Sequence, residues 1–241
     1  MSRLRWWSRP VTDALPAQTG VRDGLAWAWF APDDPPRGAV VVLHGAGSRK
    51  ENHFDVARVL RGGRFGALVA DLRGHGASPG AMDGRAIEDV ATLADLAREL
   101  SGGAPVALRG SSMGGWLAVV GAGAARAAAV VAICPAGGGM LRRGLAAGRF
   151  DFTADHDALD GLLAAHDDLA AAAALDVPLL LLHAEGDEQV PVEHSRAMHA
   201  AAQEAGVASR LVVVPGGHHR SAQHDPELQT LILRWLRREL A

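Results

Sequence analysis

Short apolar runs alternate along this chain with longer segments that have helical periodicity. The run AVVVLHG at 39–45 is rich in β-branched residues and bounded by glycines, a pattern that predicts a buried strand. Predicted strands span 25–32, 39–45, 67–74, 104–110, 128–135, 177–184 and 209–217. Because most of these runs lack polar alternation, we expect both faces of the strands to be covered, as in a parallel sheet.

The segments between the runs have the spacing and end signals of helices. Between 84 and 103, Ile87, Val90, Leu93 and Leu96 recur at helical spacing before a Gly-Gly pair. Predicted helices span 52–63, 84–103, 114–126, 191–206 and 225–240. The alternating order predicts an α/β fold, a doubly wound and mostly parallel sheet with helices on both faces. No internal repeat or low-complexity linker interrupts it, so we expect a single domain over 1–241.

Residues 135–176 do not fit the alternation. This stretch holds a glycine-rich segment and two acidic, alanine-rich helical patterns, more than a single crossover needs. We expect a small cap insertion over the carboxyl edge of the sheet, where such folds bind ligands.

Composition excludes several classes of protein. Hydrophobic residues make up 49% and charged residues 21% of the 241 positions, enough for a sizeable core. The net charge of −3 is spread along the chain, so we expect neither nucleic-acid nor membrane binding. No G-x-G-x-x-G follows the first strand and no P-loop is present, which argues against nucleotide binding. The oligomeric state stays open.

Cysteine and histidine content gives no support for a metal or another cofactor. Cys134 is the only cysteine, so neither an intrachain disulfide nor a cysteine metal cluster is possible. His194 and His199 are five positions apart, which does not place two ligands on one helix face. The N-terminal segment has no apolar stretch long enough for a signal peptide, and the apolar window 116–134 is interrupted by Arg126. We therefore expect a cytoplasmic protein without cofactors.

A G-x-S-x-G motif lies between a predicted strand and a predicted helix. The segment GSSMG at 110–114 places Ser112 between two glycines, whereas Ser111 would have bulkier neighbours at the same positions. A sharp strand-to-helix turn exposes the central hydroxyl and needs neighbours nearly free of side chain. Ser112 is therefore the candidate nucleophile. The alternative is a glycine-rich turn that only caps the helix.

A serine nucleophile needs a base, and the base needs an acid to orient it. In this architecture the acid follows the nucleophile along the chain and sits in a loop after a strand. Asp187 occupies such a loop in LLLLHAEGDEQVP, with Glu185 and Glu188 as weaker neighbours. We expect Asp187 to be the acid, although it could merely order the turn.

The histidine is expected after the last strand. The segment VVVPGGHHRSAQH offers His218, His219 and His224. His224 lies near the start of the last helix and is better explained as a cap or surface residue. His218 and His219 both follow the glycine turn, and the residues alone leave either of them possible.

Acyl transfer also needs hydrogen-bond donors for the developing oxyanion. One is expected from the backbone N–H after the nucleophile, that of Met113. The other is expected from the glycine-rich loop after the strand at 39–45, where we choose the Ala46 N–H. An ordinary strand-to-helix turn would have the same composition.

Five segments together resemble the α/β-hydrolase fold family. HGAGSRKEN, DLRGHGAS, GSSMGG, HAEGDEQVP and PGGHHR occur in the family's order and spacing, over about 38–240. The chain is most similar to the branch of serine esterases and serine aminopeptidase-like hydrolases. The resemblance implies Ser112 as nucleophile, Asp187 as acid and the fourth residue after Pro215, His219, as base. It also implies that RGHG is a shaping turn, so that His75 is not catalytic.

These observations predict a serine hydrolase that cleaves small carboxylic acyl esters through an acyl-enzyme intermediate. A thioesterase, amidase or peptidase would use the same Ser-His-Asp triad, and the sequence does not separate them. No strongly basic entrance that would favour phosphorylated acyl carriers is visible in the sequence. A non-catalytic scaffold is less favoured because all three triad residues are present.

Overall fold

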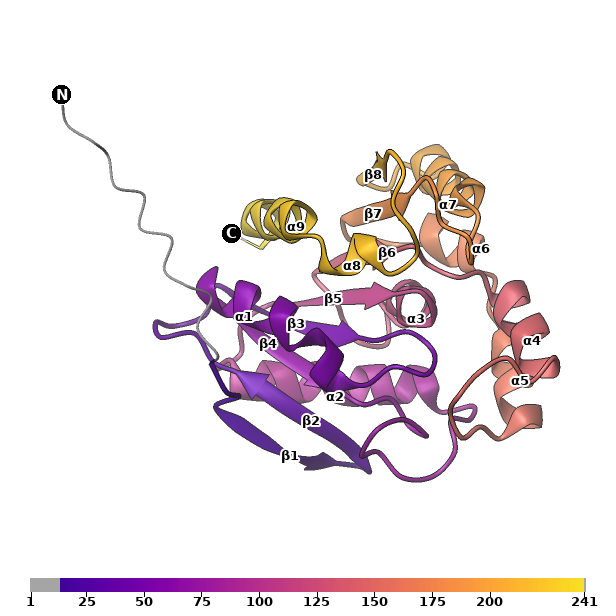
Figure 1. Cartoon of the computed structure of the whole chain (residues 1–241). Helices are drawn as coiled ribbons and strands as arrows, with labels where there is room; N and C mark the ends of the chain where they lie inside the picture. The colour runs from indigo at the N-terminus through magenta and orange to yellow at the C-terminus, as the bar shows by residue number, and fades with distance from the viewer. Residues whose placement is uncertain (1–13, 241) are drawn as a thin grey trace.

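The fold of residues 14–240 is described by a computed structural model (Figure 1). Its strands form one sheet of eight, and seven of them match the predicted runs to within a few residues. The strands are β1 (Gln18–Arg22), β2 (Leu25–Phe30), β3 (Gly38–Leu43), β4 (Phe65–Ala70), β5 (Val106–Ser111), β6 (Ala129–Ile133), β7 (Leu179–Ala184) and β8 (Ser209–Val214).

The sheet has the order β1-β2-β4-β3-β5-β6-β7-β8. Strand β1 runs antiparallel to β2, and β2 runs antiparallel to β4. All the other pairings are parallel. The central strands β3 to β7 are buried along their whole length, as their unbroken apolar runs predict.

Helices cover both faces of this sheet. One face packs against α1 (Phe54–Gly62) and α9 (Pro226–Glu239). The other packs against α2 (Ala86–Leu100), α3 (Met113–Val120), α6 (Asp168–Ala173) and α7 (Val192–Glu204). The structure therefore confirms the doubly wound α/β fold expected from the alternation.

The remaining helices lie at the carboxyl ends of the strands. In Figure 1, α4 (Gly138–Ala146) and α5 (His156–Ala165) stand beyond the ends of β5 and β6. The short helix α8 (Ser221–His224) follows β8 and leads into α9. A 3-10 turn, η1 (Lys50–His53), precedes α1. Loops after the five neighbouring parallel strands β3, β5, β6, β7 and β8 thus meet at one edge of the sheet.

Three elements have no counterpart among the predicted ones. Strand β1, with the sequence QTGVR, pairs at the sheet edge without any apolar run. Helix α4 begins in the glycine-rich segment, and α8 has only four residues. Most of the N-terminal segment considered for targeting, residues 1–13, lies outside the described part of the chain. None of the helices in residues 14–240 has the length and apolar character needed to cross a bilayer.

Candidate active site

Ser112 occupies the turn between β5 and α3. Its backbone has φ 54° and ψ −119°, a left-handed conformation that is strained for a residue with a side chain. A β-carbon on Gly110 would lie 1.9 Å from the Gly114 carbonyl oxygen, and one on Gly114 would lie 2.2 Å from that of Leu43. Both glycines are therefore sterically required, as expected for the neighbours of the central serine in a sharp strand-to-helix turn. Ser111 is the last residue of β5 and is buried.

Asp187 and His219 are brought together from loops 32 positions apart in the chain. The Nδ1 atom of His219 lies 2.7 Å from Asp187 Oδ2, so the imidazole N–H donates to the carboxylate. The side chain of Asp187 is fully buried and that of His219 is 8% exposed. This contact fixes the imidazole with Nε2 directed away from the acid.

Three further groups of the chain hold the Asp187 carboxylate. The backbone N–H groups of Gln189 and Val190 donate to Oδ1 at 2.8 and 2.9 Å. His183 Nε2 lies 3.4 Å from Oδ2. Burial favours the neutral acid, but the hydrogen bonds from His183, His219 and the two N–H groups hold the pKa of Asp187 well below its usual range. Asp187 is thus an anion at neutral pH.

The two adjacent histidines have different surroundings. The side chain of His218 is exposed, and its backbone N–H donates to Ser221 Oγ at 2.9 Å. His219 is buried against Asp187, and its backbone N–H donates to Glu188 Oε2 at 3.4 Å. His224 lies in α8 with its Nδ1 atom 3.0 Å from Asp55 Oδ2. Of the three, only His219 contacts the predicted acid.

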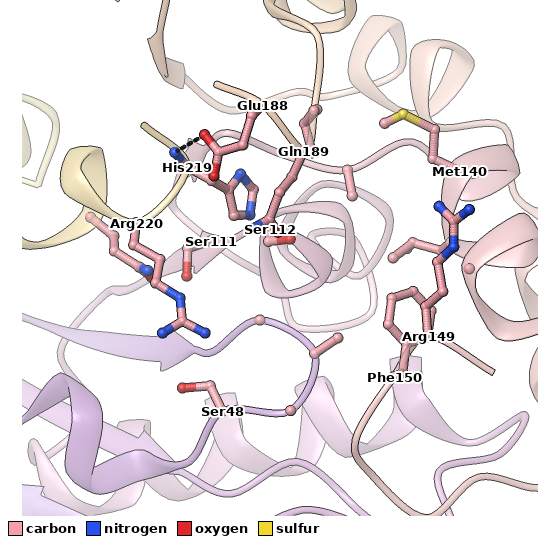
Figure 2. Close-up of a pocket in the computed structure, with 18 of the residues that line it drawn as sticks. Ser48, Ser111, Ser112, Met140, Arg149, Phe150, Glu188, Gln189, His219 and Arg220 are labelled. Atoms are coloured by element: carbon pink, nitrogen blue, oxygen red, sulfur yellow. Dashed lines mark hydrogen bonds between the residues drawn. The ribbon is translucent and has the colours of Figure 1, made fainter. Parts of the chain in front are cut away.

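A pocket of about 1190 Å³ opens above Ser112 and His219. In Figure 2 the imidazole of His219 points toward Ser112 from the α8 side of this pocket. Within residues 14–240, no hydrogen bond joins the Ser112 hydroxyl to the imidazole of His219. The Nδ1 atom of that imidazole bonds Asp187. Catalytic hydrogen bonds often tighten only when a substrate is bound.

The loop after β3 lines the same pocket. The carbonyl oxygen of Gly45 accepts from His44 Nδ1 at 2.8 Å and from the Ser48 N–H at 3.2 Å. Since the peptide bond is planar and trans, the Ala46 N–H points away from these two donors. Ala46 lines the pocket together with Ser112. Met113 is the first residue of α3, so its N–H has no acceptor within the helix.

The single lysine of the chain fixes that loop to the loop after β4. Lys50 donates to Asp71 twice, through its backbone N–H to Oδ1 and through Nζ to Oδ2, both at 2.7 Å. Asp71 Oδ2 also accepts from the Ala77 N–H at 2.8 Å, just after the RGHG turn. In that turn, His75 is buried, its Nδ1 atom lies 3.1 Å from the Arg73 carbonyl oxygen, and its ring stacks on Phe152 at 4.2 Å. The Asp71 contacts connect the two loops, and no hydrogen bond among residues 14–240 joins His75 to Asp187.

One group of side chains has the residue types of a metal site. The ligand atoms of Cys134, His183 and Asp187 all lie within 4.8 Å of one another. Burial raises the pKa of the Cys134 thiol to about 12, so it stays protonated. His183 already bonds the Val190 carbonyl oxygen at 2.9 Å through Nε2 and Ser195 Oγ at 2.7 Å through Nδ1. The group is better suited to hold Asp187 than to bind a cation.

Several of these contacts were not anticipated from the sequence. His183 is the last polar residue of an apolar strand, four positions before Asp187, and this placement could have indicated a role beside the acid. Lys50 could have been noted as the only lysine in a chain with many arginines. Nothing in the local sequence of Asp71 indicated that it joins two loops.

Comparison with known proteins agrees with the fold. A family model described as serine aminopeptidase, S33, matches residues 34–147, and one described as TAP-like protein matches residues 164–239. The chain has the α/β-hydrolase fold. Among curated proteins, an uncharacterized protein YfhR of Escherichia coli O157:H7 is 25% identical over 221 residues, covering 82% of this chain and 70% of the relative.

Solved structures of the same fold include several esterases. Est1E from Butyrivibrio proteoclasticus, solved with ferulic acid bound, is 19% identical with a TM-score of 0.74, covering 93% of this chain and 99% of that one. A Paleococcus ferrophilus monoacylglycerol lipase is 22% identical with a TM-score of 0.71, covering 89% and 99%. A Pyrococcus furiosus esterase is 22% identical with a TM-score of 0.73, covering 90% and 88%.

Proposed function

We propose that this protein is a serine hydrolase that cleaves small carboxylic acyl esters, with Ser112 as nucleophile, His219 as base and Asp187 as acid. The observation that carries the proposal is the 2.7 Å contact between His219 Nδ1 and Asp187, at the edge of the pocket that His219 shares with Ser112. The matched family model and the esterases and lipase of the same fold support ester hydrolysis.

Each residue has a defined part in the reaction. His219 Nε2 takes the Ser112 proton as Oγ attacks the ester carbonyl carbon, and Asp187 stabilises the imidazolium that forms. The N–H groups of Met113 and Ala46 donate to the oxyanion. When the C–O bond breaks, the imidazolium returns its proton to the leaving alcohol. Water then attacks the acyl-enzyme with His219 again as base, which releases the carboxylic acid and restores Ser112.

A substrate panel and one variant test the proposal. Purified protein is assayed with p-nitrophenyl esters, with acyl thioesters and with aminoacyl anilides, and we expect the highest kcat/KM for the esters. Ser112→Ala is expected to lower kcat on the order of 10⁶-fold, since only binding and oxyanion stabilisation remain. A fluorophosphonate is expected to label the native protein at Ser112.

Ser111→Ala serves as the matched control, because Ser111 is the neighbouring hydroxyl in the same motif. It is expected to keep most of the activity and the labelling. Comparable turnover by Ser112→Ala and the native protein would place the nucleophile elsewhere. A preference for thioesters or anilides over esters would retain the triad and overturn the substrate class.

A further inference from the structure

Arginines from separate parts of the chain line the pocket above Ser112. Arg143 lies in α4, Arg149 lies in the loop that follows α4, and Arg220 directly follows His219 in the chain. The carboxylates that line the same pocket belong to Asp151 and Glu188. No basic run marks this gathering in the sequence, because the fold brings the three residues together.

Within residues 14–240, Arg143 and Arg149 form no salt bridge, whereas the adjacent Arg142 does. Arg142 Nε and Nη2 donate to the two carboxylate oxygens of Asp160 on α5, both at 2.8 Å. Arg142 does not line the pocket, but Arg143 does. The two consecutive arginines of α4 thus differ. The charge of Arg142 is neutralised by Asp160 of α5, whereas Arg143 lines the pocket.

Two glycines of α4 lie beside Arg143 and Phe150. A β-carbon on Gly139 would lie 3.6 Å from Arg143 Nη1, so the guanidinium lies back along the helix over Gly139. A β-carbon on Gly144 would lie 2.4 Å from the ring of Phe150. The ring therefore packs directly on the helix backbone and holds the loop that carries Arg149.

The loop with Arg149 also reaches the loop after β3. A β-carbon on Gly47 would lie 3.5 Å from the Asp151 carbonyl oxygen, and the two loops line one pocket. Met140, Leu141 and Phe150 add apolar surface to the same side. In Figure 2, Arg149 and Phe150 lie on the α4 side of Ser112, while Arg220 lies on the opposite side.

We propose that Arg143 and Arg149 form an anion subsite, and that the substrate is an ester whose acyl or alcohol part carries a carboxylate or phosphate group. This inference rests on the proposed esterase function. Guanidinium groups bind carboxylate and phosphate oxygens through paired N–H donors. The apolar side chains on the same side fit a short hydrocarbon segment between the ester and the anion.

Matched ester pairs that differ only in charge test the subsite. For the acyl part, p-nitrophenyl hemiadipate is compared with its terminal amide. For the alcohol part, the acetyl ester of 4-hydroxybenzoate is compared with that of 4-hydroxybenzamide. The test variant is the double substitution Arg143→Gln/Arg149→Gln. The controls are Arg142→Gln on the same helix and Arg220→Gln on the opposite side of the pocket.

We expect the double variant to lose on the order of 10- to 100-fold in kcat/KM for the anionic ester of at least one pair, the range of a charged hydrogen bond. The neutral partner of that pair is expected to change little, and both controls are expected to keep the native preference. The native preference for the anionic ester is also expected to weaken as salt is added. The pair that responds identifies whether the acyl or the alcohol part carries the anion.

Three results would overturn the subsite. Equal loss on anionic and neutral esters would mean that the arginines only support the fold. A selective loss in Arg220→Gln alone would move the anion to the other side of Ser112. No selective loss in any variant would leave the arginines without a ligand role.

A binding measurement separates the subsite from the proposed esterase function. If the native protein hydrolyses none of these esters, the esterase proposal fails, and the dissociation constants of adipate and adipamide are compared by calorimetry. Tighter binding of adipate that the double variant loses would support the subsite without turnover. Equal binding of the two compounds would overturn it.

Discussion

Arg109 Nη2 donates a 2.7 Å hydrogen bond to the main-chain carbonyl oxygen of Gln223. Arg109 lies in β5 three residues before Ser112, and Gln223 lies in α8 four residues after His219. Arg109 is 0% exposed, and burial lowers the pKa of its guanidinium to about 10. Within residues 14–240, its Nε and Nη1 atoms have no hydrogen-bond partner. The single bond to Gln223 therefore connects the strand of the candidate nucleophile to the segment of the candidate base.

Arg109→Met is expected to lower kcat about 10-fold, because a hydrogen bond that positions the α8 segment is lost. Methionine fills a similar space without a buried charge, and replacing a poorly compensated buried charge often preserves or raises stability. We therefore expect the melting temperature to be unchanged or higher. Ester turnover and thermal unfolding of the same preparation measure both effects.

Arg98→Met provides the control for this variant. Arg98 Nη2 also donates to a main-chain carbonyl, that of Ala125 at 2.8 Å, but Ala125 does not lie in a segment next to the candidate acid or base. Its loss is expected to leave kcat unchanged. A large fall in stability with unchanged kcat in Arg109→Met would show that Arg109 supports the fold without positioning the base.

The two adjacent histidines give a second prediction. His219→Ala is expected to lose activity nearly as severely as Ser112→Ala, since a triad acts as a unit. His218→Ala is expected to keep most of the activity, because that side chain is exposed and does not contact Asp187. Steady-state kinetics of both variants with one ester decide between them. The reverse order of severity would mean that the base is His218.

The third prediction concerns the close approach of α3 to β3. In Gly114→Ala, the new β-carbon would meet the carbonyl oxygens of Leu43 at 2.2 Å and His44 at 2.6 Å. Backbone must shift to relieve this clash, so we expect a loss of about 1–3 kcal/mol in the free energy of unfolding. Activity is expected to fall as well, because Leu43 and His44 lead into the loop that carries Ala46.

Gly161→Ala in α5 is the control for that substitution. A β-carbon there would meet nothing within 4 Å, and alanine is the better helix former. We expect a gain of about 0.5–1 kcal/mol, measured by urea unfolding of both variants. Equal stability of Gly114→Ala and the native protein would contradict the steric requirement at the turn.

Seven of the eight strands, and the segments that carry Ser112, Asp187 and His219, could be predicted because each has a local signal. Apolar runs predict buried strands, and the glycines around Ser112 reflect contacts that the turn itself demands. The choice of His219 over His218 depended on family spacing, because two glycines before the pair obscure the side-chain alternation. The structure places only His219 against Asp187, while their catalytic roles stay a prediction.

Other features of the site could not be predicted because they depend on long-range placement. Arg109 and Gln223 are 114 positions apart, and nothing near either residue indicates their hydrogen bond. Helix α4 begins with glycines, which have low helix propensity, so packing of its buried leucines must outweigh the local preference. The gathering of Arg143, Arg149 and Arg220 likewise exists only in the folded chain.

The fourth prediction is a loss of stability in mild acid, and it follows from three buried histidines. The rings of His44 and His75 lie 4.8 Å apart, and those of His44 and His53 lie 6.4 Å apart. Burial lowers the pKa of His44 from 6.5 to about 4, that of His53 well below 6.5, and that of His75 below 6.5. All three are therefore neutral in the folded protein at neutral pH.

Below pH 6.5 the unfolded chain binds protons at these histidines and the folded chain does not, so the folded state loses stability as the pH falls toward about 4. Each histidine that remains neutral contributes a slope of up to about 1.4 kcal/mol per pH unit.

Hydrogen bonds outweigh burial and lower the pKa of Asp55 to about 2, so this carboxyl titrates below the pH range in which the histidines act. Burial raises the pKa of Asp89, which opposes the loss at the acidic end, so the slope is best measured between about pH 5 and 6.5. Urea unfolding across that range is expected to show a smaller slope in His53→Phe than in the native protein, by at most about 1.4 kcal/mol per pH unit. His156→Gln, which removes an exposed histidine, is expected to keep the native slope. An unchanged slope in His53→Phe would show that the buried histidines do not govern the acid sensitivity of the fold.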